Sequence, residues 1–192
     1  MVLTAQIENA IRFSIKTHEV YQKQKRKGKD IPYITHPLAV GLLLARANAS
    51  EDVIVAGILH DTIEDSIASK KVTPEMLLKR FGEKVKDLVV SVTEERKDLP
   101  WEQRKRKAIA AIKTFSHNAL LVKSADVISN VSEILCDFKK DGIAIFGRFN
   151  GPADKVISHH RGAMETILAV WSENPFTDDL KALMAGLDEM ET

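Results

Sequence analysis

The sequence predicts a single all-α domain of roughly eight or nine helices. Apolar residues recur at spacings of three and four along most of the chain, which is the period of an amphipathic helix. No pair of alternating β-branched stretches flanks a hairpin turn, so strand signals are weak. A length of 192 residues with 44% hydrophobic and 29% charged residues suits one globular domain with a sizeable core.

Each helix has its own local signals. In the first, Ile7, Ile11 and Ile15 lie near one face. Thr73 is an N-cap before the segment TPEMLLKRFG, which Gly82 ends. The expected helices cover residues 4–25, 38–47, 50–65, 73–82, 83–92, 101–115, 116–139 and 152–172. The main domain is expected over residues 1–176, with a helical tail over 177–192 that adds a weakly anchored turn or two.

Composition narrows the class of function. Twenty-eight Lys and Arg residues against 27 Asp and Glu give a net charge of +1. Nucleic-acid binders need a surplus of cations, so no nucleic-acid partner is expected. No apolar run approaches the ~20 residues of a membrane span, so no membrane partner is expected either. The absence of a signal-like N-terminus and the single Cys136, expected to be a small buried hydrophobe, favour a cytoplasmic protein.

The octet ILHDTIED, residues 58–65, ends an apolar helix in a histidine and three carboxylates. If the helix continues, His60 stacks near Glu64 and Asp61 near Asp65, because residues four apart share a face. Buried carboxylates cost several kcal/mol each unless they meet water, a cation or a metal ion. Emergence of the helix into solvent is the simpler alternative for this octet alone.

Two further polar residues change that balance. His36 precedes a proline in YITHP, and Asp126 lies in the middle of the aliphatic helix of LLVKSADVISNVSEIL. One divalent cation bound by His36, His60, Asp61 and Asp126 satisfies all of these groups. Two imidazoles and two carboxylates suit Mn²⁺ or Fe²⁺, with Mg²⁺ and Zn²⁺ less favoured. A cation of this kind activates water and polarises a phosphoryl oxygen.

The pattern H…HD…D resembles the HD superfamily of metal-dependent phosphohydrolases. The motifs PYITHPLAV, ILHDTIED, FGEKVKDLVVSVTEE and LVKSADVISN resemble, in order, those of RelA/SpoT-type (p)ppGpp hydrolases and their small stand-alone relatives. The resemblance implies an HD-type domain, a Mn²⁺-dependent (p)ppGpp 3′-pyrophosphohydrolase and a small nucleotide as the partner. It implies metal ligation by His36, His60, Asp61 and Asp126, and catalysis by Glu64 and Asp65. Substrate binding is implied for Arg26, Lys27 and Asn130, with Tyr33 on the same loop.

Departures from the family pattern leave alternatives open. This chain reads ADVISN where the alarmone branch commonly reads ADRLHN, so Val127 and Ser129 replace an arginine and a histidine. An HD-domain nucleotidase or phosphodiesterase acting on another nucleotide is one alternative. A non-catalytic nucleotide-sensing domain is a second, and a basic RNA adaptor is a third. A homo-oligomer is also open.

The remaining polar residues have ordinary interpretations. The cations of KQKRKGKD and WEQRKRK read mainly as solvated, with Arg104 or Lys105 as possible phosphate contacts. His159 and His160 lack ligand neighbours at helical spacing and are expected to be surface or packing residues. His18, on the inner face of the first helix, is expected to be a satisfied core histidine.

Overall fold

The computed structural model describes residues 3–94 and 99–190, and within them the all-α prediction is confirmed. Those residues contain no strand, only an isolated bridge between Lys25 and Pro32. The α-helices are α1 Ala5–Ile15, α2 Thr35–Arg46, α3 Glu51–Leu59, α4 Thr62–Asp65, α5 Pro74–Phe81, α6 Glu83–Val92, α7 Trp101–Ile112, α8 His117–Asp141, α9 Ala153–Val170 and α10 Thr177–Glu189. A π-helix, η1 Lys16–Tyr21, and two 3₁₀ segments, η2 Ala68–Lys70 and η3 Gly142–Arg148, complete them.

The first predicted helix is shorter than expected and changes its geometry. Thr4 caps α1 by accepting a hydrogen bond from the Ile7 amide. After Ile15 the chain continues as η1 and stops at Tyr21 rather than at residue 25. A π-helical turn is wider than an α-helical one and is frequently found at functional sites. Here it lies directly before the loop that leads to His36.

Helices α2 and α3 approach closely because each carries a glycine at their contact. A Cβ atom built on Gly57 would lie 2.2 Å from Leu44 Cδ1, and one built on Gly41 would lie 2.7 Å from Ile58 Cγ1. Every residue of α3 from Val53 to Leu59 is buried. Residues without a side chain are therefore what allow the two helix backbones to come together.

The predicted helix over residues 50–65 is interrupted at His60 and Asp61. Helix α3 ends at Leu59, and α4 begins at Thr62. Asp61 has φ −93° and ψ −3°, in the sparsely populated bridge region where many active-site residues are found. The stacking of His60 on Glu64 along one continuous helix is thus wrong, because the turn redirects the polar side chains.

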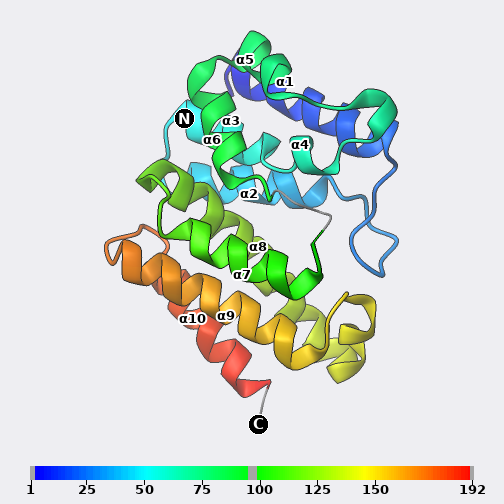
Figure 1. Ribbon diagram of the computed structural model, residues 1–192, viewed down its shortest axis with the longest axis vertical. Helices are drawn as coiled ribbons and strands as arrows, with labels where there is room; N and C mark the ends of the chain where they lie inside the picture. The colour runs from blue at the N-terminus through cyan, green and yellow to red at the C-terminus, as the bar shows by residue number, and fades with distance from the viewer. Residues whose placement is uncertain (1–2, 95–98, 191–192) are drawn as a thin grey trace.

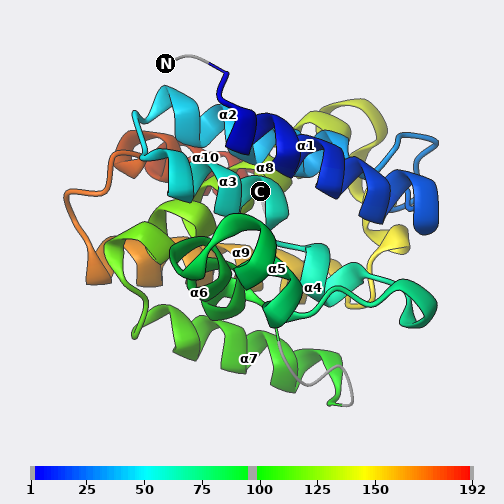
Figure 2. The same cartoon turned by 90° about the horizontal axis from the view of Figure 1, so that it is seen from above.

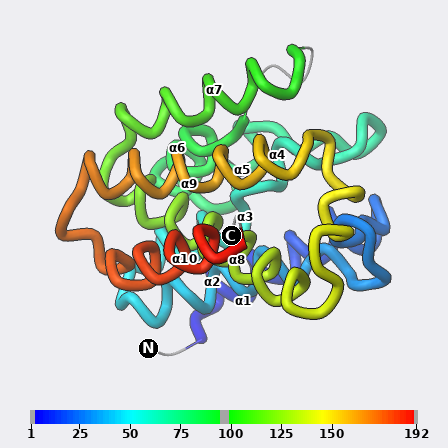
Figure 3. Tube along the Cα trace, turned by 90° about the horizontal axis from the view of Figure 1, so that it is seen from below, coloured from blue at the N-terminus to red at the C-terminus, as the bar shows by residue number. Residues whose placement is uncertain are grey.

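Helix α8 runs through the middle of the molecule, between the layer of α2, α3 and α6 and the layer of α9 and α10 (Figures 1 and 2). The C-terminal segment forms the 13-residue helix α10, which packs against α8 and α9 (Figure 3). Leu180 and Leu187 of α10 are fully buried. The expectation of a weakly anchored turn or two is therefore wrong for residues 177–189.

The structure also bears on Cys136 and on whether any helix could span a membrane. Cys136 is exposed, contrary to the buried position that its apolar neighbours suggested, because it lies on the outer face of α8. Among the described residues, no helix combines the length and apolar character required to cross a membrane.

Candidate metal centre and active site

Three of the four predicted metal ligands form a compact buried cluster. Ligand atoms of His36, His60 and Asp126 all lie within 4.8 Å of one another. His36 comes from the first turn of α2, His60 from the end of α3, and Asp126 from the middle of α8. The cluster therefore depends on the packing of three helices that are distant in sequence.

The His60 ring is oriented by the backbone of its own helix. Its Nδ1 lies 2.7 Å from the Gly57 carbonyl oxygen, which only accepts hydrogen bonds, so Nδ1 carries the proton. The lone pair of the neutral ring is then on Nε2. This Nε2 atom is buried and has no hydrogen-bond partner among the described residues. A buried lone pair of this kind suits a metal ligand.

His36 presents its Nε2 atom to the same point. Its Nδ1 lies 2.9 Å from the Ser129 hydroxyl, while Nε2 is 3.3 Å from Asp126 Oδ1 and 3.7 Å from Asp61 Oδ2. A partner on the far nitrogen fixes the ring orientation of a metal-binding histidine. Ser129, the residue at a departure from the family pattern, supplies that partner.

Asp61, the fourth predicted ligand, lies at the edge of the cluster. Its Oδ2 atom is 3.0 Å from His60 Nε2, yet the two atoms are not aligned as a hydrogen bond. The Tyr33 hydroxyl donates to this carboxylate. Two polar groups in contact without a hydrogen bond between them suit the predicted ligation of one cation by both.

Asp126 has local partners that the sequence interpretation underestimated. Lys123 Nζ lies 2.8 Å from its Oδ2, and the Asn130 amide donates to its Oδ1 over 2.6 Å. The Asp126 carboxylate thus has two partners on its own helix. Its Oδ1 still faces both imidazoles, at 3.3 Å from His36 and 3.9 Å from His60.

The electrostatics of the cluster favour a positive charge at its centre. Burial lowers the pKa of His60, but the Asp61 and Asp126 carboxylates outweigh this effect and raise it to about 9. Burial raises the pKa of Asp61, and the facing His60 and His36 reverse this and hold it below its usual range. A proton on His60 thus supplies the positive charge that two buried carboxylates require. A divalent cation bound by these residues supplies it more fully.

The two predicted catalytic carboxylates extend from α4 toward the same cavity. Glu64 accepts a hydrogen bond of 3.3 Å from the Glu94 amide, and Asp65 accepts one of 2.9 Å from Gln24 Nε2. Gln24 Oε1 in turn lies 2.9 Å from His18 Nδ1. His18 is fully buried as expected, but only half satisfied, because its Nε2 has no partner among the described residues.

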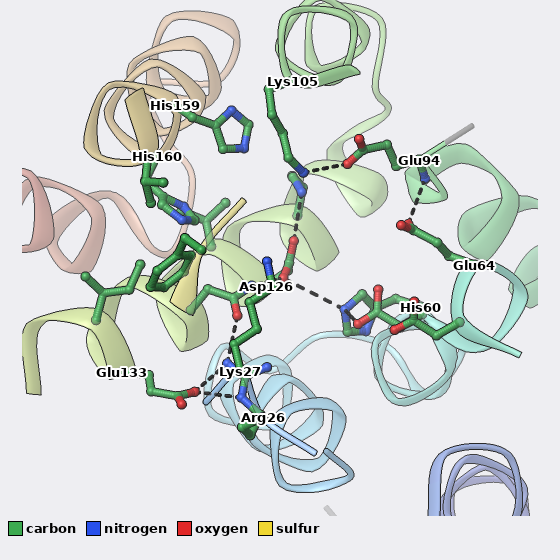
Figure 4. Close-up of a pocket in the computed structure, with 18 of the residues that line it drawn as sticks. Arg26, Lys27, His60, Glu64, Glu94, Lys105, Asp126, Glu133, His159 and His160 are labelled. Carbon is green, nitrogen blue, oxygen red and sulfur yellow. Dashed lines mark hydrogen bonds and ion pairs between the residues drawn. The ribbon is translucent and has the colours of Figure 1, made fainter. Parts of the chain in front are cut away.

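A cavity of about 310 Å³ opens beside the cluster (Figure 4). Nine of the ten predicted site residues line it, with His36 as the exception: Arg26, Lys27, Tyr33, His60, Asp61, Glu64, Asp65, Asp126 and Asn130. The structure thus places residues that were predicted from separate segments of the sequence around one cavity.

Of the two basic residues before PYITHP, Arg26 forms an ion pair with Glu133, whereas Lys27 forms none among the described residues. Arg26 is held by Glu133 at 2.7 Å and by Asn130 at 2.9 Å, and its guanidinium lies over the Tyr33 ring. Lys27 has no ion pair among the described residues. Its burial, with Lys105 and other cations near it, holds its pKa below the usual range. Lys27 is therefore the cation most in need of an anion.

The structure adds His159 and His160 to the cavity and separates the two possible phosphate contacts Arg104 and Lys105. Lys105 lines the cavity and pairs with Glu94 at 2.7 Å, whereas Arg104 pairs with Glu94 at 3.1 Å and does not line it. His159 and His160 were expected to be surface or packing residues, and the structure places both in the wall of the cavity. No spacing signal could have found them, because their neighbours come from other helices.

A helical fold that gathers two imidazoles, two carboxylates and three lysines around one cavity fits the class of metal-dependent phosphohydrolases. The chain belongs to the HD domain family, whose model matches residues 10–141. The resemblance read from the sequence motifs is thereby confirmed.

Known relatives agree with this assignment. A guanosine-3′,5′-bis(diphosphate) 3′-pyrophosphohydrolase of Xenopus tropicalis is 34% identical over 132 residues, which cover 68% of this chain and 70% of that protein. The protein of the same name from Homo sapiens is 33% identical over the same shares. Among solved structures, a metazoan ortholog of SpoT that hydrolyses ppGpp superposes with a TM-score of 0.74 over 99% of this chain and 96% of the other, at 23% identity. A Listeria monocytogenes protein superposes with a TM-score of 0.71 over 80% of this chain and 99% of the other, at 29% identity.

Proposed function

We propose that this protein is a (p)ppGpp 3′-pyrophosphohydrolase that uses one divalent cation, with Mn²⁺ as the expected ion and the cytoplasm as the expected location. The observation that carries the proposal is the orphaned Nε2 of His60, which faces His36, Asp61 and Asp126 beside a cation-lined cavity. Relatives that are 33–34% identical and bear that activity in their names support the choice of substrate.

The reaction divides between the cation and the side chains of this chain. When bound by His36, His60, Asp61 and Asp126, the cation supplies Lewis-acid activation of water and of a phosphoryl oxygen. Glu64 and Asp65 orient the attacking water and take its proton, since both carboxylates extend into the cavity from the turn that follows Asp61.

The bonds balance without a co-reactant. Water oxygen bonds to the phosphorus nearest the ribose, the bond from that phosphorus to the 3′ oxygen breaks, and the 3′ oxygen receives a proton. The products of ppGpp are GDP and pyrophosphate. Lys27 and Lys123 lie where they stabilise the charge that develops on the phosphoryl oxygens, because both line the cavity.

The other predicted substrate contacts, Arg26, Tyr33 and Asn130, line the same cavity. Arg26 and Asn130 hold each other, so they present a fixed donor surface rather than a mobile guanidinium. Tyr33 supports that surface from beneath, through its ring contact with Arg26, and also donates to Asp61. We infer that this group binds the nucleoside part of the substrate.

The test is pyrophosphate release from ppGpp with Mn²⁺, after EDTA and in the Glu64→Gln variant. We expect activity that chelation abolishes and that Glu64→Gln lowers by a factor of about 10² or more, the usual contribution of a positioned acid or base. Asp178→Asn, which changes an exposed acid on α10, is the matched control and keeps full activity.

Other outcomes assign other functions. Hydrolysis of other nucleotides alone would retain the cation site and overturn the alarmone assignment. Binding of Mn²⁺ and ppGpp without turnover would identify a sensing domain.

A further inference from the structure

Two adjacent histidines of α9 lie outside the segment that the family model matches. The match ends at residue 141, whereas α9 spans Ala153–Val170. His159 and His160 nevertheless extend from α9 toward the cavity, on the wall opposite His60 and Glu64 (Figure 4). No step proposed above uses them.

The surroundings of these rings favour one tautomer. Nδ1 of His159 and Nδ1 of His160 are both buried without a hydrogen-bond partner among the described residues. An unpaired buried N–H is less tolerated than an unpaired acceptor lone pair. The proton of each neutral ring is therefore expected on Nε2, so that each ring offers an N–H donor on its outer edge.

Both rings remain uncharged over the physiological range. Burial, and then the proximity of the His160 ring, lower the pKa of His159 to about 2. Burial lowers the pKa of His160 to about 4, with Lys123 and Lys105 acting in the same direction and Asp126 against it. These rings provide hydrogen-bond donors without adding charge to a wall that already holds lysines.

This wall has more donors than acceptors. Lys27 and Lys105 lie near the histidines, and the acid that is closest to Lys105, Glu94, is already shared between Arg104 and Lys105. A nucleobase edge presents both donors and acceptors, so it would leave donors unpaired here. A phosphate group presents acceptors alone and would satisfy all of them.

We propose that His159 and His160, with Lys105, form a second phosphate subsite that holds the 5′-phosphate groups of the nucleotide while the 3′-diphosphate lies at the cation. This subsite rests on the proposed function, and it makes α9 a determinant of specificity for nucleotides phosphorylated at both ends.

The test compares two substrates that differ only at the 5′ position, namely ppGpp and guanosine 3′-diphosphate. His159→Phe and His160→Phe keep an aromatic ring of similar shape and remove its donor. His117→Phe is the matched control, because His117 is exposed at the start of α8 and stacks on Trp171. For each variant, kcat and KM are measured on both substrates.

We expect each α9 variant to raise KM for ppGpp about tenfold or more, the usual cost of a lost hydrogen bond to a charged group. On guanosine 3′-diphosphate the change should stay below about twofold, and His117→Phe should match the parent protein on both. An equal loss on both substrates would indicate a structural role and overturn the proposal, as would no loss on either.

Failure of the proposed function is distinguishable from failure of this subsite. If the parent protein hydrolyses neither substrate, the proposed function is wrong, and calorimetric binding of inorganic pyrophosphate in EDTA then tests the subsite alone. Weaker binding in His159→Phe and His160→Phe than in His117→Phe would support the subsite. Equal binding in all three would overturn it.

Discussion

The two imidazoles of the cation site are fixed by unlike partners. The Gly57 carbonyl leaves His60 only one tautomer, because a carbonyl cannot donate. The Ser129 hydroxyl next to His36 either donates or accepts, so it adapts to the state of the ring. Ser129 thus departs from the family motif and still orients His36, a predicted ligand.

We predict that Ser129→Ala lowers the affinity for Mn²⁺ about tenfold or more, because loss of an outer-shell partner typically costs 10–100-fold in metal affinity. Titration of Mn²⁺ followed by electron paramagnetic resonance measures this directly. Ser132→Ala, an exposed serine of the same helix, is the control. Equal affinity in both variants would show that Ser129 does not orient His36.

At the scale of elements, Gln24 connects the π-helix η1 to Asp65 of helix α4. The backbone N–H of Gln24 donates to the backbone carbonyl of His18 over 2.9 Å, and the side chains of the two residues are also hydrogen-bonded. Because an ionised carboxylate only accepts, the Gln24 NH₂ group must face Asp65, and its oxygen must accept from His18 Nδ1. The hydrogen bonds from His18 to Gln24 and from Gln24 to Asp65 thus hold the Asp65 side chain in place.

We therefore predict that Gln24→Glu lowers kcat about tenfold with little change in KM, since it keeps the shape and the His18 contact but places a second carboxylate against Asp65. Steady-state kinetics on ppGpp separate the two constants, and the pH dependence of kcat should shift. The same substitution at Gln103, an exposed residue of α7, should change neither. A rise in KM alone would assign Gln24 to substrate binding.

The grouping of His60, Asp61 and Asp126 around one cavity could be predicted from the sequence. The costly placement of His60, Asp61 and Asp126 in apolar segments indicated a shared partner before any geometry was available. The break between α3 and α4 could not be predicted, because helical periodicity carries no signal for a single residue, Asp61, in the bridge region. His159 and His160 were missed because the groups around them belong to other helices.

At the scale of the whole molecule, the cavity wall formed by α7, α8 and α9 makes stability depend on pH. The pKa of His160 is lowered to about 4 and that of His159 to about 2, so the unfolded chain binds protons that the folded chain excludes. The contribution of these rings to stability is complete above pH ~6.5 and is lost as the pH falls toward the folded-state values.

We predict that the melting temperature in EDTA falls between pH 7 and pH 5, and that it falls less steeply in a variant with both His159→Phe and His160→Phe. Calorimetric or fluorescence melts at fixed ionic strength measure the slope. His117→Phe should follow the parent protein, because His117 lies outside the cavity. Parallel slopes in all three proteins would contradict the prediction.

The missing side chain of Gly57 has a consequence for ion selection. Helix α2 carries His36, α3 leads to His60, and their separation is set where the Leu44 side chain occupies the place that a Cβ on Gly57 would take. A larger residue there would spread the two imidazoles, while its carbonyl could still hold the His60 ring. The hydrogen atom that Gly57 carries in place of a side chain thus sets the separation of the two helices, and with it the distance between the two imidazoles that would bind the cation.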